Sequence, residues 1–292
     1  MRRDQDNGEG VIPNSATTDI PYTALITGAS SGLGYELSKA IYPYVDRLII
    51  TGRSQERLRA VKNELVALFP NKKSSSIESI VYDFSAPLKG SDLVASFDSG
   101  LPHILINNAG FGWYGRFLHE PFLQQARIME VNVTRTMELT HEWSDRVSKL
   151  ASNHYPYSLC FISSMAAFMP IPGMAAYAAS KAALLSFAEA IRTEFHEMNV
   201  PISVLTVCPG QFRTGFQKLA AHKVDPFSDL QDRTSFDALI LSEKIIHKIL
   251  QGKQGVYIPS PWRIQKFLMK FLPEEFLKRT ILKRLLTRID AL

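Results

Sequence analysis

Short apolar runs alternate with longer amphipathic segments along most of this 292-residue chain. Each run has the length of a buried strand, and most are followed by Gly, Asn, Asp or Ser, residues that favour turns. We expect strands at residues 22–27, 47–51, 77–82, 102–106, 158–162, 202–207 and 255–258. Segment 55–69 carries Leu58, Val61, Leu65 and Leu68 at helical spacing, which predicts an amphipathic helix with these side chains inward.

Further helices are expected at residues 35–41, about 121–152, 175–198 and 241–251. Strands that alternate with helices are typical of an α/β fold with a parallel sheet. A chain of this length fits one such domain. We therefore expect one domain over residues 21–260, after a polar, mobile N-terminal extension at residues 1–20.

Composition excludes several classes of protein. The chain is 46% hydrophobic and 21% charged, as in ordinary folded proteins. The two cysteines, Cys160 and Cys208, lie within or directly after apolar runs, so neither a disulfide framework nor a metal site is expected. The polar start does not resemble a secretory signal, and no apolar run reaches the roughly 18 residues of a membrane span. We expect a cytoplasmic protein.

A glycine-rich turn follows the first predicted strand, with the sequence Gly28-Ala-Ser-Ser-Gly32-Leu-Gly34. Such a turn lets the backbone approach a ligand, and the next helix offers free N–H groups to a phosphate. The spacing is G-x-x-x-G-x-G instead of the common dinucleotide G-x-G-x-x-G. A turn that serves only packing is the alternative.

Ser163 and Ser164 end the fifth predicted strand, and Tyr177-Ala-Ala-Ser-Lys181 lies in the following helix. Residues four apart share a helix face, so the Lys181 ammonium is expected to lower the pKa of Tyr177. Tyr177 would then serve as an acid or base near neutral pH. Taken alone, such a pair is more often an ordinary feature of a helix surface.

Together these motifs resemble the short-chain dehydrogenase/reductase family in its single-domain form, over residues 22–259. The resemblance rests on the turn from Thr27 to Gly34, on Asn107-Asn-Ala-Gly110 and on Ser164 with Tyr177-x-x-x-Lys181. It implies a Rossmann-like, doubly wound, mostly parallel seven-stranded sheet with helices on both faces. The residues after 260 lie beyond the resemblance, and their own pattern adds a C-terminal amphipathic helical extension to the expected fold. Related proteins often pair through the two long helices that hold Asn132 and Tyr177, so the resemblance also implies a homo-oligomer.

The resemblance assigns roles residue by residue. The catalytic residues would be Asn132, Ser164, Tyr177 and Lys181. Nicotinamide cofactor contacts would come from Gly28, Ser30, Ser31, Gly32, Leu33, Gly34, Arg53, Asp83, Phe84, Asn108, Ala109, Gly110, Tyr177, Lys181, Pro209, Gly210 and Thr214. The family's serine lies thirteen residues before its tyrosine, which selects Ser164 over Ser163. Arg135 replaces a usual glycine three residues after Asn132.

Cofactor choice depends on the end of the second predicted strand. Enzymes that use NAD usually place an acidic side chain there, whereas an arginine accepts the 2′-phosphate of NADP. This chain has Gly52-Arg53, which predicts NADP(H) and, with it, carbonyl reduction as the usual direction. The alternative is that Arg53 is a solvated loop charge.

The net charge of +5 lies entirely in residues 261–292, which hold eight Lys and Arg against three Asp and Glu. Leu277, Ile281 and Leu285 follow helical spacing there. A basic amphipathic helix suits an anionic membrane surface. The alternative is packing on the protein body or on another subunit. A Leu-rich face makes nucleic-acid binding the weaker interpretation.

Apolar residues near the expected nicotinamide end suggest a hydrophobic carbonyl substrate, unless they serve only the core: Trp113, Tyr114, Met165, Phe168, Met169, Ile171 and Met174. The sequence thus predicts an NADP(H)-dependent oxidoreductase acting on an apolar or lipid-like ketone or aldehyde. A non-catalytic nucleotide-binding sensor or membrane-associated scaffold is the alternative, and it predicts loss of at least one of the four catalytic residues. Extended sugar-nucleotide epimerases are disfavoured by the glycine spacing.

Overall fold

The computed structural model describes residues 22–88, 92–119, 121–150, 157–210, 237–260 and 262–269. The predicted extension at residues 1–20, the predicted cofactor contact Thr214 and the tail beyond residue 269 lie outside these ranges.

The described chain forms a seven-stranded sheet in the order β3-β2-β1-β4-β5-β6-β7. Its strands are β1 (Thr23–Ile26), β2 (Arg47–Gly52), β3 (Ile77–Val81), β4 (Ile104–Asn107), β5 (Tyr157–Ile162), β6 (Ile202–Val207) and β7 (Gly255–Tyr257). All six pairings are parallel. The predicted α/β fold is confirmed, and the strand order reverses direction between β1 and β4, where such sheets bind ligands.

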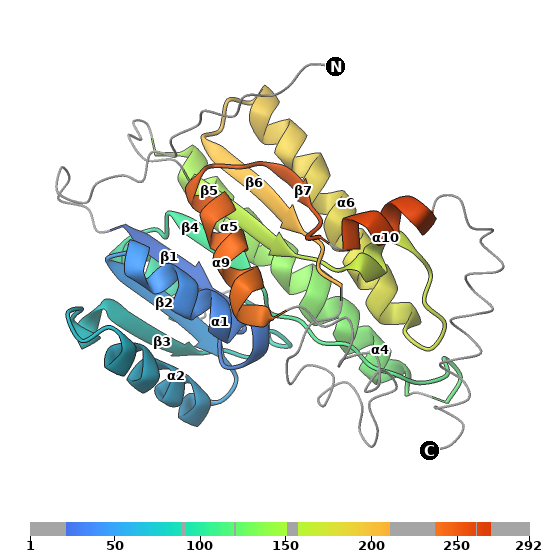
Figure 1. Ribbon diagram of the computed structural model, residues 1–292, viewed down its shortest axis with the longest axis horizontal. Coiled ribbons are helices and arrows are strands. Elements are labelled where there is room, and N and C mark those ends of the chain that lie inside the picture. The colour runs from blue at the N-terminus through green and yellow to red at the C-terminus, as the bar shows by residue number, and fades with distance from the viewer. Residues whose placement is uncertain are drawn as a thin grey trace.

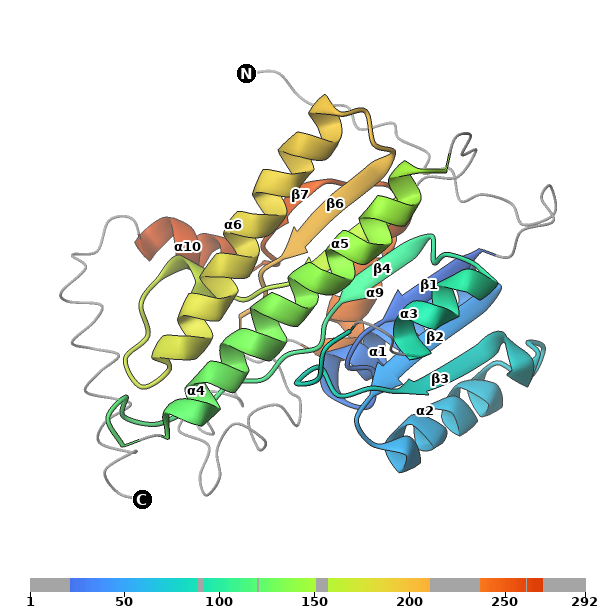
Figure 2. The ribbon, with the colours of Figure 1, turned by 180° about the vertical axis from the view of Figure 1, so that it is seen from behind.

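Helices cover both faces of this sheet. Figure 1 shows α1 (Gly32–Ile41), α2 (Gln55–Leu68) and α9 (Ala238–Leu250) on one face. Figure 2 shows α3 (Asp92–Ala95), α4 (Phe122–Met129), α5 (Arg135–Ser148) and α6 (Ala175–Glu197) on the other. A short 3-10 helix, η6 (Met165–Phe168), follows β5, and α10 (Trp262–Met269) contacts it.

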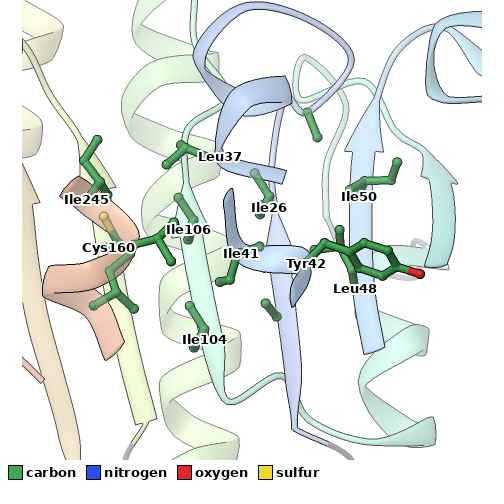
Figure 3. Packing of buried hydrophobic residues seen from close by; sticks show 14 of the residues in the cluster. Ile26, Leu37, Ile41, Tyr42, Leu48, Ile50, Ile104, Ile106, Cys160 and Ile245 are labelled. Atoms are coloured by element: carbon green, nitrogen blue, oxygen red, sulfur yellow. The ribbon is translucent and has the colours of Figure 1, made fainter. Parts of the chain in front are cut away.

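Successive strand residues point to opposite faces, which divides the core into two layers. Ile26 and Ile106 pack with Leu37 of α1 and Ile245 of α9 (Figure 3). Leu25 packs in the second layer, whose other buried residues include Leu105, Leu139, Trp143 and Leu184. Strands covered on both faces read as continuous apolar runs, which is the pattern seen in the sequence.

One predicted inward residue is wrong. Leu68 is 50% exposed, whereas Leu58, Val61 and Leu65 are buried as expected. Phe69 takes its place, because its ring packs edge-on against Tyr42 with 5.4 Å between centroids. Positions three and four residues after Leu65 both continue the apolar face, and the bulkier ring occupies the inward one.

Candidate active site

Ser164 and Tyr177 meet at the carboxyl end of β5. Ser164 follows the strand and starts η6, where its hydroxyl accepts a hydrogen bond from the Ala166 N–H at 3.1 Å. Tyr177 lies in the first turn of α6, and its phenol forms a hydrogen bond with Ser164. The fold thus brings together two hydroxyl groups that lie thirteen residues apart in the sequence.

Lys181 lies one turn beyond Tyr177 on α6 and is only 5% exposed. Its Nζ donates to the carbonyl oxygen of Ile162 at 2.9 Å and lies 5.8 Å from the centroid of the Tyr177 ring. Burial lowers the pKa of Lys181 to about 8. The predicted helical arrangement of the pair is therefore present, with the lysine buried beneath the tyrosine.

The expected depression of the Tyr177 pKa is not seen in the protein alone. Burial raises the pKa of Tyr177 to about 12, and the hydrogen bond with Ser164 offsets only part of this rise. The reason is that desolvation penalises the phenolate more than its neighbours stabilise it. At neutral pH the half-buried phenol therefore keeps its proton.

Asn132 lies in a π-helical turn, Glu130–Thr134, that separates α4 from α5. The single helix expected over residues 121–152 is therefore interrupted. The Asn132 side chain accepts from the Phe111 N–H at 3.0 Å and donates to the Phe111 carbonyl at 2.9 Å. It also donates to the Ser180 hydroxyl at 3.0 Å, and Ser180 donates to the Tyr177 carbonyl at 2.7 Å. Such π turns often occur at functional sites.

Arg135 follows the π turn and forms ion pairs with Glu130 and Glu138. These carboxylates lie on either side of it along the helix, so the guanidinium spans the irregular turn. This accounts for a large basic residue at a position where the related pattern has glycine.

The glycine turn is built closely enough to hold a pyrophosphate. Gly28 and Gly32 adopt φ values of +66° and +61°, which side chains rarely adopt. A Cβ on Gly34 would lie 2.3 Å from the Gly28 carbonyl oxygen. The turn leads directly into α1, and Ser31 at its start is exposed. These features fit a dinucleotide phosphate at the helix N-terminus.

Thr27 was not assigned a role from the sequence. Its hydroxyl accepts from the N–H groups of Asn108, at 3.0 Å, and Ala109, at 2.9 Å. The Asn108 amide in turn donates to the carbonyls of Thr27 and Gly28, at 2.9 and 3.2 Å. The glycine turn and the segment after β4 are thus one hydrogen-bonded unit. The signal that was available is a threonine directly before Gly28.

The remaining predicted cofactor residues are distributed along the same edge of the sheet. Arg53 is exposed after β2, and Asp83 is exposed after β3. Burial raises the pKa of Asp83, but hydrogen bonds from Ser85 and the charges of Arg53 and Arg127 outweigh it, so the net pKa lies below its usual value. Phe84, also a predicted cofactor contact, has a side chain that is 5% exposed and packs in the core.

Two of the predicted cofactor glycines have close side-chain neighbours. A Cβ on Gly110 would lie 3.0 Å from Asn132 Oδ1 and 3.4 Å from Lys181 Nζ. Gly210, after Pro209, lies against the indole of Trp262, which sequence reasoning did not place in the site. No local pattern signals this contact, because more than fifty residues separate the two.

The apolar residues predicted near the nicotinamide end are only partly covered. Trp113, Tyr114, Met165, Phe168, Met169 and Ile171 are half-buried, and Met174 is buried. The Gly115 N–H donates to the Gly173 carbonyl at 3.0 Å, which joins the two segments that carry them. Core packing thus does not account for these side chains fully, since most retain solvent-exposed surface.

Comparison with known proteins agrees with this geometry. The model of the short chain dehydrogenase family matches residues 22–225. A dehydrogenase/reductase SDR family member 7B from Danio rerio is 30% identical over 238 residues, covering 80% of this chain and 75% of the relative. The chain therefore belongs to the short-chain dehydrogenase/reductase family and is an oxidoreductase of CH–OH and C=O groups.

Solved structures show the same architecture. A short-chain dehydrogenase from Sphingobium yanoikuyae in complex with NADPH has a TM-score of 0.68 at 23% identity, covering 87% of this chain and 97% of that one. A 3-oxoacyl-[acyl-carrier protein] reductase from Brucella melitensis in complex with NAD has a TM-score of 0.68 at 26% identity, covering 81% and 92%. Among the described residues, no helix is both long enough and apolar enough for a membrane crossing.

Proposed function

We propose that this protein is an NADP(H)-dependent carbonyl reductase that uses Ser164, Tyr177 and Lys181. The observation that carries the proposal is the hydrogen bond between Ser164 and a protonated Tyr177 above the buried Lys181. The cofactor, when bound, supplies the hydride. Tyr177 donates its proton to the substrate oxygen, and Ser164 donates a hydrogen bond that stabilises the charge developing on that oxygen. Lys181 stabilises the resulting phenolate.

Asn132 has a supporting role in this proposal. Its side chain is hydrogen-bonded to Phe111 and Ser180, so it joins the π turn to α6. On the family resemblance, a water held at Asn132 would connect Lys181 to solvent and return a proton to it. The four residues are all present, which argues against a sensor or scaffold that has lost catalysis.

NADP(H) is proposed over NAD(H) because the residue after β2 is Arg53. Its guanidinium can pair bidentately with a 2′-phosphate, whereas no acidic residue follows that strand directly to bind a ribose hydroxyl. Of the two solved relatives described above, one is in complex with NADPH and the other with NAD, so they favour neither cofactor. The proposal of NADP(H) therefore rests on Arg53.

The proposed substrate is an apolar or lipid-like ketone or aldehyde, because the side chains between Ser164 and Tyr177 are mainly apolar and partly exposed. The direct test is to assay NADPH oxidation with a panel of such carbonyls. Turnover that Tyr177→Phe abolishes supports the proposal. Absence of turnover with every carbonyl, or turnover unchanged in Tyr177→Phe, would refute it.

We further propose that residues 261–292 associate with an anionic membrane surface. The support is their excess of positive charge, together with Ile264 and Phe267 of α10, which are 60% and 59% exposed. Sedimentation with phosphatidylserine vesicles should fall for Lys283→Gln with Arg284→Gln. Equal sedimentation with neutral and anionic vesicles would exclude an electrostatic attachment.

Pairing with a second copy through α5 and α6 is also proposed, on the family resemblance. Light scattering of the purified chain tests it, and a monomer at all concentrations would contradict it.

A further inference from the structure

The start of the tail is packed tightly on the protein body. Trp262, the first residue of α10, is 5% exposed and joins the core layer that also contains Val207 of β6. A Cβ on Gly210 would lie 2.4 Å from the indole Nε1 and 2.5 Å from both Cδ1 and Cε2. The indole therefore lies flat against the Gly210 backbone, and only glycine leaves room for it.

The segment that Trp262 contacts, Val207–Gly210, is hydrogen-bonded to the residues on either side of Ser164. The Met165 N–H, directly after Ser164, donates to the Pro209 carbonyl at 2.8 Å. The Ser163 N–H donates to the Val207 carbonyl at 2.8 Å. A shift of Gly210 is therefore transmitted to the end of β5 within a few bonds.

A second contact of α10 reaches the same region. Lys266 lies one turn after Trp262, and its Nζ is 3.6 Å from the centroid of the Phe168 ring. This is a close cation–π geometry. Phe168 ends η6, the short helix that Ser164 caps at its N-terminus, and α10 contacts η6. Helix α10 thus contacts η6, which directly follows Ser164, and also the Pro209–Gly210 segment, which is hydrogen-bonded to Met165.

We propose that α10 is a structural part of the active site and that Trp262 is a positioning residue for the nicotinamide end of the cofactor. The inference rests on the proposed function and on the family resemblance, which implies that Pro209 and Gly210 lie on the nicotinamide side of the cofactor. Trp262 holds the Gly210 backbone in place by filling the space above it, and Lys266 holds η6 through Phe168. In the proposed function the adenosine end contacts Gly28–Gly34 and Arg53, whereas the contacts of α10 described above are with Gly210 and η6.

Cofactor binding separates positioning from general stability. Full-length Trp262→Ala should bind NADPH at least about tenfold more weakly, because small misplacements of a site are costly. Its affinity for adenosine 2′,5′-bisphosphate, which lacks the nicotinamide half, should stay unchanged. Trp262→Phe should restore most NADPH binding, and Ile264→Ala, on the exposed face of α10, should have no effect.

Three outcomes would overturn the proposal: equal loss of both ligands in Trp262→Ala, unchanged binding of both, or an equal effect from Ile264→Ala. Failure of the wild type to bind any nicotinamide cofactor would instead refute the proposed function.

The contact between Trp262 and Gly210 is tested separately, by heat denaturation without cofactor. Gly210→Ala should lower Tm clearly in the wild type and much less in Trp262→Phe, whose smaller ring leaves space for the methyl group. An equal fall in both backgrounds would overturn the contact itself.

Discussion

The side-chain amide of Asn132 donates a hydrogen bond to the hydroxyl of Ser180 at 3.0 Å, and this bond joins the π turn to the helix that carries Tyr177 and Lys181. Both residues are buried, at 1% and 0% exposed. Because Ser180 also donates to the Tyr177 carbonyl, it links the two predicted catalytic elements through one oxygen atom.

Ser180→Ala is expected to destabilise the protein by about 1–3 kcal/mol, since it leaves a buried amide N–H without its partner. The catalytic rate should fall while cofactor affinity stays close to that of the wild type, because the change displaces Tyr177 and not the glycine turn. Urea unfolding and steady-state kinetics measure the two effects. Ser148→Ala, at an exposed hydroxyl bonded to Asp145, is the matched control. Equal effects of both substitutions would contradict the linking role.

Lys181→Met is expected to abolish turnover and yet to stabilise the fold at neutral pH by about 1–3 kcal/mol. The folded pKa of Lys181 is lowered from 10.5 to about 8, so burial of its charge costs free energy below pH 8. Between pH 8 and 10.5 the unfolded lysine binds the extra proton, and wild-type stability rises with pH. The advantage of Lys181→Met should therefore shrink across that window. A constant difference would contradict the buried charge.

Tyr177 predicts different pH dependences for the two directions of the reaction. Its pKa of about 12 keeps the phenol protonated at neutral pH, where it is ready to donate a proton in carbonyl reduction. Alcohol oxidation needs the phenolate, so its rate should rise steadily with pH. Initial rates in both directions between pH 6 and about 10 provide the comparison. A reduction rate that increases towards alkaline pH would be inconsistent with this assignment.

Arg53→Ala should raise the KM for NADPH by about tenfold to a hundredfold, through loss of a charge-assisted contact with the 2′-phosphate. The KM for NADH, which lacks that phosphate, should change little. Arg59→Ala is a suitable control because Arg59 is also exposed and lies on α2. Equal changes in KM for both cofactors would show that Arg53 does not bind the 2′-phosphate.

The buried His103 side chain is expected to make the stability of the fold sensitive to acid. Burial lowers its pKa from 6.5 to about 4, and its Nδ1 accepts from the Thr23 N–H at 3.1 Å. Because the unfolded histidine binds a proton that the folded one excludes, stability should fall as pH drops from 6.5 towards 4. His103→Gln should flatten this slope, and exposed His141→Gln should not. Chemical unfolding at several pH values measures the slope.

The sequence pattern was sufficient for the strands and for the Tyr177–Lys181 pair, whereas the choice of Ser164 over Ser163 came from the family resemblance. The strands could be recognised as continuous apolar runs because both faces of the sheet are covered. Tyr177 and Lys181 could be paired because residues four apart share a face in any α-helix. The predicted lowering of the Tyr177 pKa was wrong, because helical spacing does not show how far burial removes the phenol from solvent. Phe69 replaced Leu68 because two adjacent positions both complete the apolar face.

Contacts between distant segments were beyond the pattern. Trp262 reaches Gly210 only after β7 has returned the chain to the carboxyl edge of the sheet, and no local spacing encodes that meeting. The π turn at Asn132 was equally hidden, since residues 122–148 have an uninterrupted helical pattern. Thr27 is a milder case, because its hydroxyl became meaningful only when the segment at Asn108 was seen beside it.

The most direct test of the account is isotope transfer. The wild-type protein is incubated with an apolar ketone and NADPH that carries deuterium at both C4 positions, and the product alcohol is analysed by mass spectrometry. We expect deuterium on the carbinol carbon with the wild type and none above background with Tyr177→Phe. Product without deuterium, or equal labelling by Tyr177→Phe, would contradict hydride transfer at this site.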